Sequence, residues 1–325
     1  MNPEVSLLKP KRLKAGDTVA LVAPASPQNE DEGIRAAIET VESLGFKVKP
    51  GVHLYERWGY LAGPDQHRAA DLNAAFADEQ VDGIICIGGG WGSPRILPYL
   101  QMDMIRANPK LLMGYSDITG LLNGIHKNTG LVTFHGPIGA QTFSSYTYSE
   151  FKKVVLDGQS NVQLGTPPVF EPAPGKVEKA NRLTRIRGGK ARGPLAGGNL
   201  SLLATLCGTP FMPDLDGRIL FIEEVGEATY RVDRMLTQLW LAGALQKCAG
   251  IVFGKFTDCK TSASWAKQLT VEEILVDRCA GLGMPVLRGL MIGHIEDQTT
   301  LPLGCQAELD VDAGTLTLLE AGVSV

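Results

Sequence analysis

The segment Leu111–Ile118, with the sequence LLMGYSDI, decides the fold class and points to the chemistry. LLMG is typical of a buried strand, and helical character resumes at Ile118. This sharp strand-to-helix turn places the Ser116 hydroxyl above the strand end, where the next backbone N–H can join an oxyanion hole. Gly114 suits the crowded turn, but Ile118 departs from the hydrolase pattern G-x-S-x-G. A helix N-cap is therefore the alternative interpretation of Ser116.

On both sides of this segment, strand and helix patterns alternate along the first half of the chain. The apolar run 18–25 precedes residues 34–44, whose apolar positions have helical spacing. A buried strand at 81–87 leads directly into the glycine-rich loop GGGWG at 88–92. Repeated β-then-α units predict a mostly parallel sheet covered by helices, with ligands bound at the carboxyl ends of the strands.

A proline-rich stretch divides the chain. Residues 165–175, GTPPVFEPAPG, contain four prolines, which disfavour a strand ladder and predict an extended linker. We therefore expect an N-terminal α/β domain at 1–164, a linker at 165–180 and a C-terminal domain at 181–325. The tail 306–319 alternates apolar and polar residues, as half-buried antiparallel strands do. The predicted fold class is α/β, with a parallel-sheet domain that carries Ser116 and a mixed α/β second domain.

Composition excludes several classes of protein. The 325 residues carry 31 basic and 35 acidic side chains, a net charge of −4, which favours neither nucleic acid nor an anionic membrane as a partner. No apolar run approaches the roughly 18 residues of a membrane span, and we expect a soluble, cytoplasmic protein. The six cysteines lack C-x-x-C spacing and no histidine pair has metal-ligand spacing. We accordingly do not expect a metal enzyme.

Three further features could carry chemistry. The glycines at 88–92 allow backbone N–H groups to approach an anion, although no lysine follows as in a P-loop, and a structural turn is the alternative. Glu223 and Glu224 end an apolar strand, where alternation directs only one of them beyond the sheet; a solvated strand end is the alternative. His294 follows a glycine in the turn GHIED, and His135, at another strand end, is its rival as a catalytic base.

The order of these features resembles the serine LD-carboxypeptidase family, which includes the muramoyl-tetrapeptide carboxypeptidases and the microcin C7 self-immunity hydrolases. The resemblance spans nearly the whole chain and is carried by GGWG (89–92), NPKLLMGYSDITGLL (108–122), TGLVTFHGP (129–137), LAGGNLSLLATLCGTP (195–210), LFIEEVGEATYRVDRMLTQL (220–239) and GHIEDQTTLPLG (293–304). It favours the nucleophile over the N-cap interpretation of Ser116.

The resemblance implies a triad assembled across a cleft between the two domains. Ser116 would be the nucleophile, His294 the general base and Glu223 the carboxylate that orients His294, with Glu224 as the alternative. The oxyanion hole would be the N–H of Asp117 with that of Gly89 or Gly90. Many members carry arginine where this chain has Gly88, so another donor would bind the substrate carboxylate.

The implied reaction cleaves the amide between the L-centre of a diamino acid and a terminal D-alanine in murein tetrapeptides, without a cofactor. The resemblance also implies a homodimer. Within the family, the alternative is hydrolysis of a peptidyl or aminoacyl adenylate, for which Trp91 would stack on the base. A third possibility, a non-catalytic muropeptide-binding protein, would not require Ser116, Glu223 and His294 together.

Overall fold

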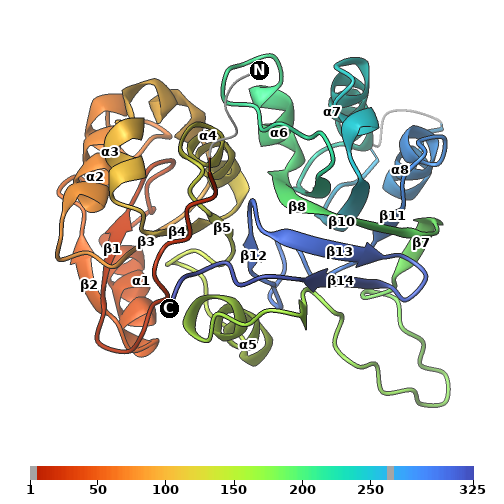
Figure 1. The fold of residues 1–325 in the computed structure, drawn as a ribbon, viewed down its shortest axis with the longest axis horizontal. Coiled ribbons are helices and arrows are strands. Elements are labelled where there is room, and N and C mark those ends of the chain that lie inside the picture. Colours follow the sequence, from red (N-terminus) through yellow and green to blue (C-terminus); the bar gives the residue numbers. More distant parts are fainter. Residues whose placement is uncertain (1–5, 262–266) are drawn as a thin grey trace.

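The computed structural model describes residues 6–261 and 267–325 and contains two sheets that lie side by side, each flanked by helices (Figure 1). The first sheet has the order β12-β5-β4-β3-β1-β2. Its strands are parallel except β12, which pairs antiparallel with β5. The strands are β1 (Thr18–Val22), β2 (Lys47–Pro50), β3 (Gly83–Cys86), β4 (Leu111–Gly114), β5 (Phe134–His135) and β12 (Leu301–Pro302). This sheet and its helices are called the first domain below.

Helices connect the parallel strands of the first domain, because a parallel pair requires a crossover. α1 buries Ile34, Ala37 and Val41 on one face, and Gly45 just beyond it has a positive φ of 96°. The helices are α1 (Asp31–Ser43), α2 (Asp65–Ala77), η1 (Ser93–Tyr99), α3 (Met102–Ala107), η2 (Ser116–Ile118), α4 (Thr119–Thr129), α5 (Ser145–Phe151) and η3 (Lys152–Leu156).

The second domain is built on an eight-stranded mixed sheet with the order β6-β14-β13-β8-β9-β10-β11-β7. Strands β8 to β11 are parallel, and the strands on both sides of them are antiparallel. The strands are β6 (Val162–Gln163), β7 (Thr184–Arg187), β8 (Lys190–Asn199), β9 (Ile219–Val225), β10 (Gly250–Thr257), β11 (Val286–Arg288), β13 (Gln306–Asp310) and β14 (Thr315–Leu318); the helices are α6 (Leu200–Leu206), α7 (Thr229–Leu241), η4 (Leu245–Lys247) and α8 (Val271–Cys279). The predicted α/β fold class is confirmed.

Two local details add to or differ from the sequence interpretation. The glycine-rich stretch 188–198 forms most of strand β8, since glycine allows its backbone to approach β9 closely: a Cβ on Gly197 would lie 1.9 Å from the Phe221 carbonyl oxygen. The apolar segment 131–134 predicts a strand, but the strand in the structure is β5 (Phe134–His135), and Leu131 forms an isolated bridge with Leu8. The described helices include none that is both long and apolar enough to cross a bilayer.

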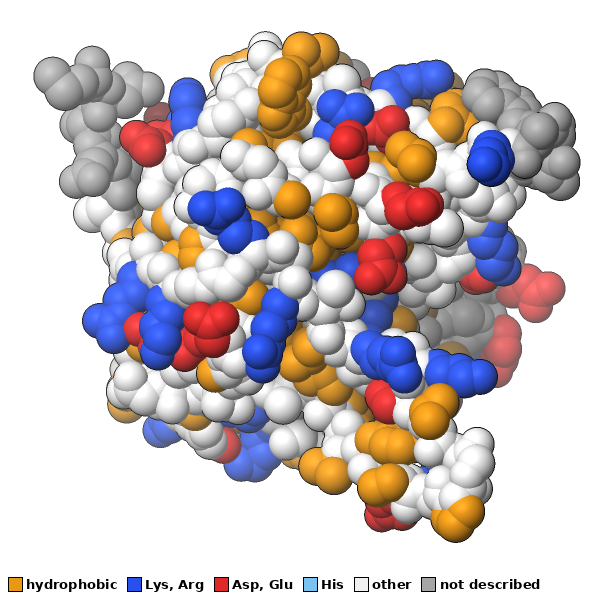
Figure 2. All heavy atoms as spheres, turned by 90° about the vertical axis from the view of Figure 1, so that its right-hand side faces the viewer, with side chains coloured by type: hydrophobic (Ala, Val, Ile, Leu, Met, Phe, Trp, Pro, Cys, Tyr) orange, Lys and Arg blue, Asp and Glu red, His pale blue; other side chains and the backbone are white. Residues whose placement is uncertain are grey.

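The proline-rich segment has a different place in the connectivity from the one expected. It joins β6 to β7, which form the two opposite edges of the second sheet, so the chain has already entered that sheet before residue 165. β12 from the C-terminal part also completes the first sheet. The segment projects from the second domain (Figures 1 and 2) with Val169 92% exposed. The domain limits remain a prediction, but 165–180 does not join the two sheets.

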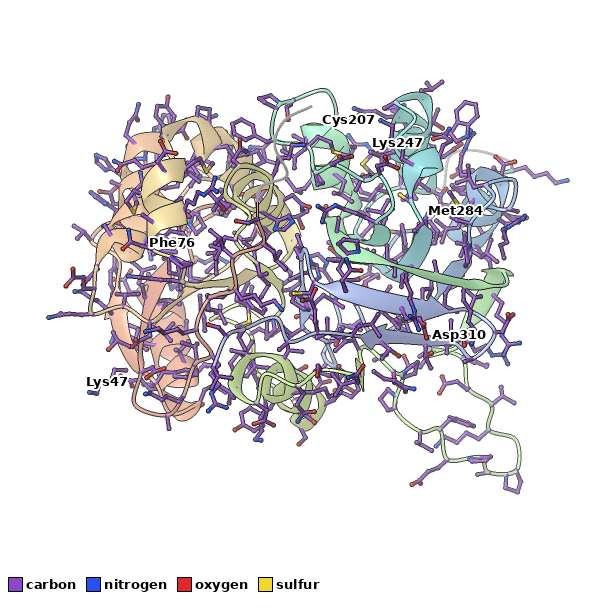
Figure 3. All side chains as sticks on the ribbon, in the orientation of Figure 1. Lys47, Phe76, Cys207, Lys247, Met284 and Asp310 are labelled. Carbon is purple, nitrogen blue, oxygen red and sulfur yellow. The ribbon has the colours of Figure 1, made fainter. Side chains whose placement is uncertain are left out.

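The apolar core crosses the boundary between the domains. One cluster of buried side chains runs from Leu21 and Phe76 of the first domain to Phe221 and Leu309 of the second. A separate cluster, which includes Met284, packs α6, α7 and α8 against the other face of the second sheet. Figure 3 shows Phe76 and Met284 in these two regions. The continuous core holds the two domains in a defined orientation, which any site shared between them requires.

Candidate active site

Ser116 occupies a strained turn between β4 and α4. β4 ends at Gly114, η2 begins at Ser116, and Ser116 has a positive φ of 62°. A side chain other than glycine is unfavourable in this left-handed region, and such strain is concentrated at functional sites. A strained strand-to-helix turn is also the conformation of a nucleophile elbow. The backbone at Ser116 therefore differs from an N-cap residue, which has extended φ and ψ.

Side chains of the second domain reach Ser116. His294, in the loop after β11, places Nε2 2.9 Å from Ser116 Oγ. Its Nδ1 lies 2.7 Å from Oε2 of Glu223, near the end of β9. Glu223 is fully buried, and the His294 side chain is 19% exposed. Thr257 Oγ1 donates to the His294 carbonyl oxygen at 2.9 Å and so holds the loop against β10.

The glycine before His294 has a steric role. Gly293 has a φ of 112°, and a Cβ at this position would lie 2.6 Å from Oε2 of Glu223. Any other residue would therefore collide with the carboxylate that bonds the His294 ring. The Gly-His pair in the sequence is thus required by the close packing of the turn on β9.

Glu224 faces away from His294 and has its own set of donors. It accepts hydrogen bonds from Asn199 Nδ2 at 2.9 Å, from the N–H and hydroxyl of Ser201 at 2.9 and 2.7 Å, and from the Val225 N–H at 2.8 Å. Burial raises the pKa of Glu224. Glu223 Oε1, by contrast, has no hydrogen-bond partner among the described residues. Within the doublet, His294 bonds to Glu223.

His135 lies near these groups but does not bond to Ser116. Neither of its ring nitrogens has a hydrogen-bond partner in the described parts of the chain. Its ring packs against Tyr115 and Phe221, with centroids 6.0 and 5.2 Å away. Burial lowers the pKa of His135 to about 4, so the ring is neutral at pH 7. A neutral ring packed in this way is a core residue.

The glycine-rich loop faces Ser116. A Cβ built on Gly89 would lie 3.0 Å from Ser116 Oγ and 3.3 Å from the Asp117 nitrogen, so the loop backbone and the turn are in close contact. The Asp117 carboxylate is buried and accepts from the Ser93 N–H at 2.6 Å, while burial raises its pKa. The Asp117 side chain thus positions η1, and any oxyanion role belongs to its backbone N–H.

Two residues that the sequence did not single out hold this loop. Ser26 Oγ accepts from the Trp91 N–H at 3.0 Å and donates to the Tyr60 carbonyl at 2.8 Å. Arg68 is buried and donates to the carbonyl oxygens of Gly92, at 2.9 Å, and Pro24. Ser26 follows β1, and the rule that sites lie at strand carboxyl ends could have found it. Arg68 had no such signal, because it lies within the helical pattern of α2.

A cleft of about 440 Å³ lies beside Ser116 between the two domains. Arg95 is the one cationic side chain among its described lining residues, which are Tyr60, Gly90, Trp91, Gly92, Pro94, Arg95, Ser116, Asp117, Asn199, Ser201, Leu202, Thr205, Glu224, Val225 and Glu227. Gly90 and Trp91 therefore line the same cavity as Ser116. Its volume is within the usual range for small-molecule sites.

Comparison with known proteins identifies the class to which this fold belongs. The LD-carboxypeptidase N-terminal domain family matches residues 19–136, and the LD-carboxypeptidase C-terminal domain family matches residues 192–309. The chain belongs to the LD-carboxypeptidase family and is a carboxypeptidase.

Particular relatives cover almost the whole chain. A probable murein peptide carboxypeptidase of Bacillus subtilis is 40% identical over 321 residues, 97% of this chain and 95% of that protein. The murein tetrapeptide carboxypeptidase of Pseudomonas aeruginosa is 31% identical over 90% of this chain and 92% of its own. Among solved structures, the wild-type apo form of the microcin C7 self-immunity protein MccF has a TM-score of 0.86 at 29% identity, covering 98% of this chain and all of that one. The predicted family is confirmed.

Proposed function

We propose that this chain is a serine LD-carboxypeptidase that removes the terminal D-alanine from murein tetrapeptides with the triad Ser116, His294 and Glu223. The observation that carries the proposal is the hydrogen-bonded series from Ser116 Oγ through the His294 ring to Glu223. The substrate class rests on relatives named murein peptide and murein tetrapeptide carboxypeptidase. Hydrolysis by such a serine triad requires no metal ion.

The reaction begins at Ser116. Its Oγ attacks the carbonyl carbon of the scissile amide while His294 Nε2 takes the hydroxyl proton. Glu223, on Nδ1, keeps the ring in the required tautomer and stabilises the imidazolium that forms. Backbone N–H groups of Asp117 and of Gly89 or Gly90 stabilise the tetrahedral oxyanion.

The intermediate then collapses to an acyl-enzyme. The C–N bond breaks, and His294 returns the proton to the amine of the departing D-alanine. Water, deprotonated by His294, then attacks the ester carbonyl carbon. The bond between this carbon and Ser116 Oγ breaks, His294 returns the proton to Oγ, and the shortened peptide leaves.

Arg95 is the group that we propose for the terminal carboxylate of the substrate. Its side chain is 44% exposed in the cleft, and Asp65 holds it by two contacts, Nε to Oδ1 and Nη2 to Oδ2, both 2.9 Å. Hydrogen bonds from Arg95 are also the main cause of the lowered pKa of Asp65. An arginine whose orientation is fixed loses little freedom on binding a carboxylate. This assignment supplies the donor that Gly88 cannot.

Mass spectrometry of purified tetrapeptides tests the proposal. A tetrapeptide with a terminal D-alanine should lose that residue, whereas the same peptide with an amidated C-terminus should remain intact. Absence of D-alanine release by folded wild-type protein would overturn the proposed activity. Replacing Arg95 by Gln should raise KM for the peptide with a free terminal carboxylate.

A nucleotide-conjugated substrate is the second candidate. Trp91 is 60% exposed at the cleft, and its ring lies edge-on to Tyr60 at 6.4 Å, which supports stacking on a base. A structure of the relative MccF contains aspartyl sulfamoyl adenosine. Cleavage of an aminoacyl adenylate analogue but not of the tetrapeptide would favour this candidate, with Trp91→Ala weakening binding.

The homodimer, which the family resemblance implies, and the cytoplasmic location, which the sequence led us to expect, complete the proposal. Light scattering coupled to size-exclusion chromatography should give twice the mass of one chain. Fractionation of the source cells should place the protein with cytoplasmic markers.

A further inference from the structure

A cluster of two histidines and a carboxylate lies outside the candidate active site, on the connection between β2 and α2. His53 and Glu56 belong to this connection, and His67 lies in the first turn of α2. One ligand atom from each of the three side chains lies within 4.8 Å of the other two. Ligand atoms on one tetrahedral zinc ion lie roughly 3.3 Å apart, given Zn–N and Zn–O distances of about 2.0–2.2 Å. Small rotations of the His53, Glu56 and His67 side chains would bring their ligand atoms to this separation.

His53 is already oriented as a metal-binding histidine is. The Asp71 carboxylate accepts from the His53 N–H at 2.9 Å and contacts its ring Nδ1 at 2.8 Å. Asp71 is buried, whereas the His53 side chain is 24% exposed. A carboxylate on Nδ1 leaves Nε2 as the free lone pair and raises its basicity, which is the usual outer partner of a zinc-bound histidine.

The charges of the cluster favour a cation. Glu56 contacts His67 Nδ1 at 2.9 Å, and Asp71 contacts His53, but neither carboxylate forms an ion pair with lysine or arginine in the described parts of the chain. With neutral imidazoles the group carries two negative charges. A divalent ion would compensate them, and imidazole with carboxylate is a ligand set suited to Zn²⁺.

Two glycines make room for these carboxylates. A Cβ at Gly63 would lie 2.4 Å from Oε2 of Glu56, and a Cβ at Gly51 would lie 2.4 Å from Oδ2 of Asp71. Both carboxylates therefore occupy positions that a larger residue would close. The spacing of the two histidines in sequence did not predict this cluster, because the turn between β2 and α2 brings them together.

We propose that His53, Glu56 and His67 bind one Zn²⁺ ion, with water in the remaining position, and that the ion fastens the segment 51–63 to α2. The same segment contains Tyr60, which lines the cleft and accepts a hydrogen bond from Ser26 through its carbonyl oxygen. The ligands of the site lie outside the triad, so the zinc proposal does not depend on the proposed function.

Titration of the tag-free, metal-stripped full chain with Zn²⁺ and Co²⁺ tests the site. Wild-type protein should bind one ion per chain, and its Co²⁺ spectrum should show d–d bands without a thiolate charge-transfer band, which excludes the free cysteines as ligands. His67→Ala and Glu56→Gln should each weaken binding at least about tenfold. Glu42→Gln, an exposed carboxylate on α1, is the matched control and should bind as wild type does.

The choice of variants keeps the test independent of folding. His53→Ala leaves buried Asp71 without its ring partner and is expected to be less stable, so His67, whose side chain is 46% exposed, is the decisive position. No binding by wild type at millimolar Zn²⁺, or unchanged binding by His67→Ala, would overturn the site. Zn²⁺ should also slow proteolysis within 51–63 in wild type only; equal cleavage rates with and without Zn²⁺ would refute the fastening of the segment.

Discussion

Two histidine–carboxylate pairs in this chain have nearly the same geometry and face different partners. In one, Nδ1 of His294 lies 2.7 Å from Glu223; in the other, Nδ1 of His53 lies 2.8 Å from Asp71. Each carboxylate is buried and each imidazole is partly exposed. In both pairs the carboxylate bonds Nδ1 and leaves Nε2 available to another group. The carboxylate therefore fixes the orientation of the imidazole ring.

The side chains near each histidine determine its chemistry. The hydroxyl of Ser116, which lines the cleft between the domains, lies 2.9 Å from His294 Nε2, a distance that allows proton transfer. The His67 ring stacks on the face of the His53 ring, with centroids 4.3 Å apart, and Glu56 contacts His67 Nδ1 at 2.9 Å. A serine oxygen accepts and gives protons, whereas two imidazoles and a carboxylate converge as metal ligands. The comparison predicts that changes at one pair leave the other function intact.

The largest expected effect comes from Ser116→Ala. Removing the nucleophile should lower kcat by roughly 10⁵–10⁶-fold, as in other serine triads. The variant should keep its circular dichroism spectrum and its Zn²⁺ binding. Near wild-type hydrolysis of tetrapeptide by this variant would remove Ser116 as the nucleophile.

The next effect separates the two glutamates of β9. Glu223→Gln should lower kcat about 10⁴-fold, because an amide favours the wrong tautomer of His294. Glu224→Gln should cause a much smaller loss, since Glu224 bonds Asn199 and Ser201. Steady-state kinetics of both variants under identical conditions shows which glutamate orients His294. A greater loss in Glu224→Gln would exchange the two assignments.

His135 contrasts with both pairs, because it is a buried histidine with no carboxylate bonded to its ring. Burial lowers its pKa to about 4, so the folded state binds fewer protons than the unfolded state between pH 6.5 and 4. Its contribution to stability is complete above about pH 6.5 and is lost as the pH falls towards 4.

The free energy of unfolding of wild type should therefore fall more steeply over this range than that of His135→Phe, by about 3 kcal/mol. Phenylalanine keeps an aromatic ring against Tyr115 and Phe221. Urea unfolding at several pH values measures the difference. Parallel curves for the two proteins would show that folding does not lower the pKa of His135.

The smallest effect concerns the outer carboxylate of the second pair. Asp71→Asn should weaken Zn²⁺ binding about 10–100-fold, the usual range for a residue that orients a metal-bound histidine. Hydrolysis by the variant should remain at the wild-type rate, because His294 retains Glu223. Isothermal titration and tetrapeptide kinetics on one preparation test both statements. Loss of hydrolysis with unchanged Zn²⁺ affinity would show that Asp71 supports the active site and not the zinc site.

Local sequence was sufficient for the fold class and the family. β4 has the bounds that LLMG predicted, and the 3.6-residue apolar spacing before Gly45 corresponds to α1. These elements follow from short-range patterns, because each strand and helix buries its own apolar positions. The turn at Ser116 was likewise recognisable, since a strand that meets a helix abruptly has few conformations.

The tertiary structure decided what is opposite each functional group. Ser116 and His294 are 178 residues apart, and the continuous core between the domains brings them within 2.9 Å. The choice between Glu223 and Glu224 depends on the twist of β9 against the His294 loop, and Arg68 reaches its carbonyls only after α2 has packed. The zinc cluster likewise requires the turn between β2 and α2. Such contacts depend on packing between distant segments, which no local pattern encodes.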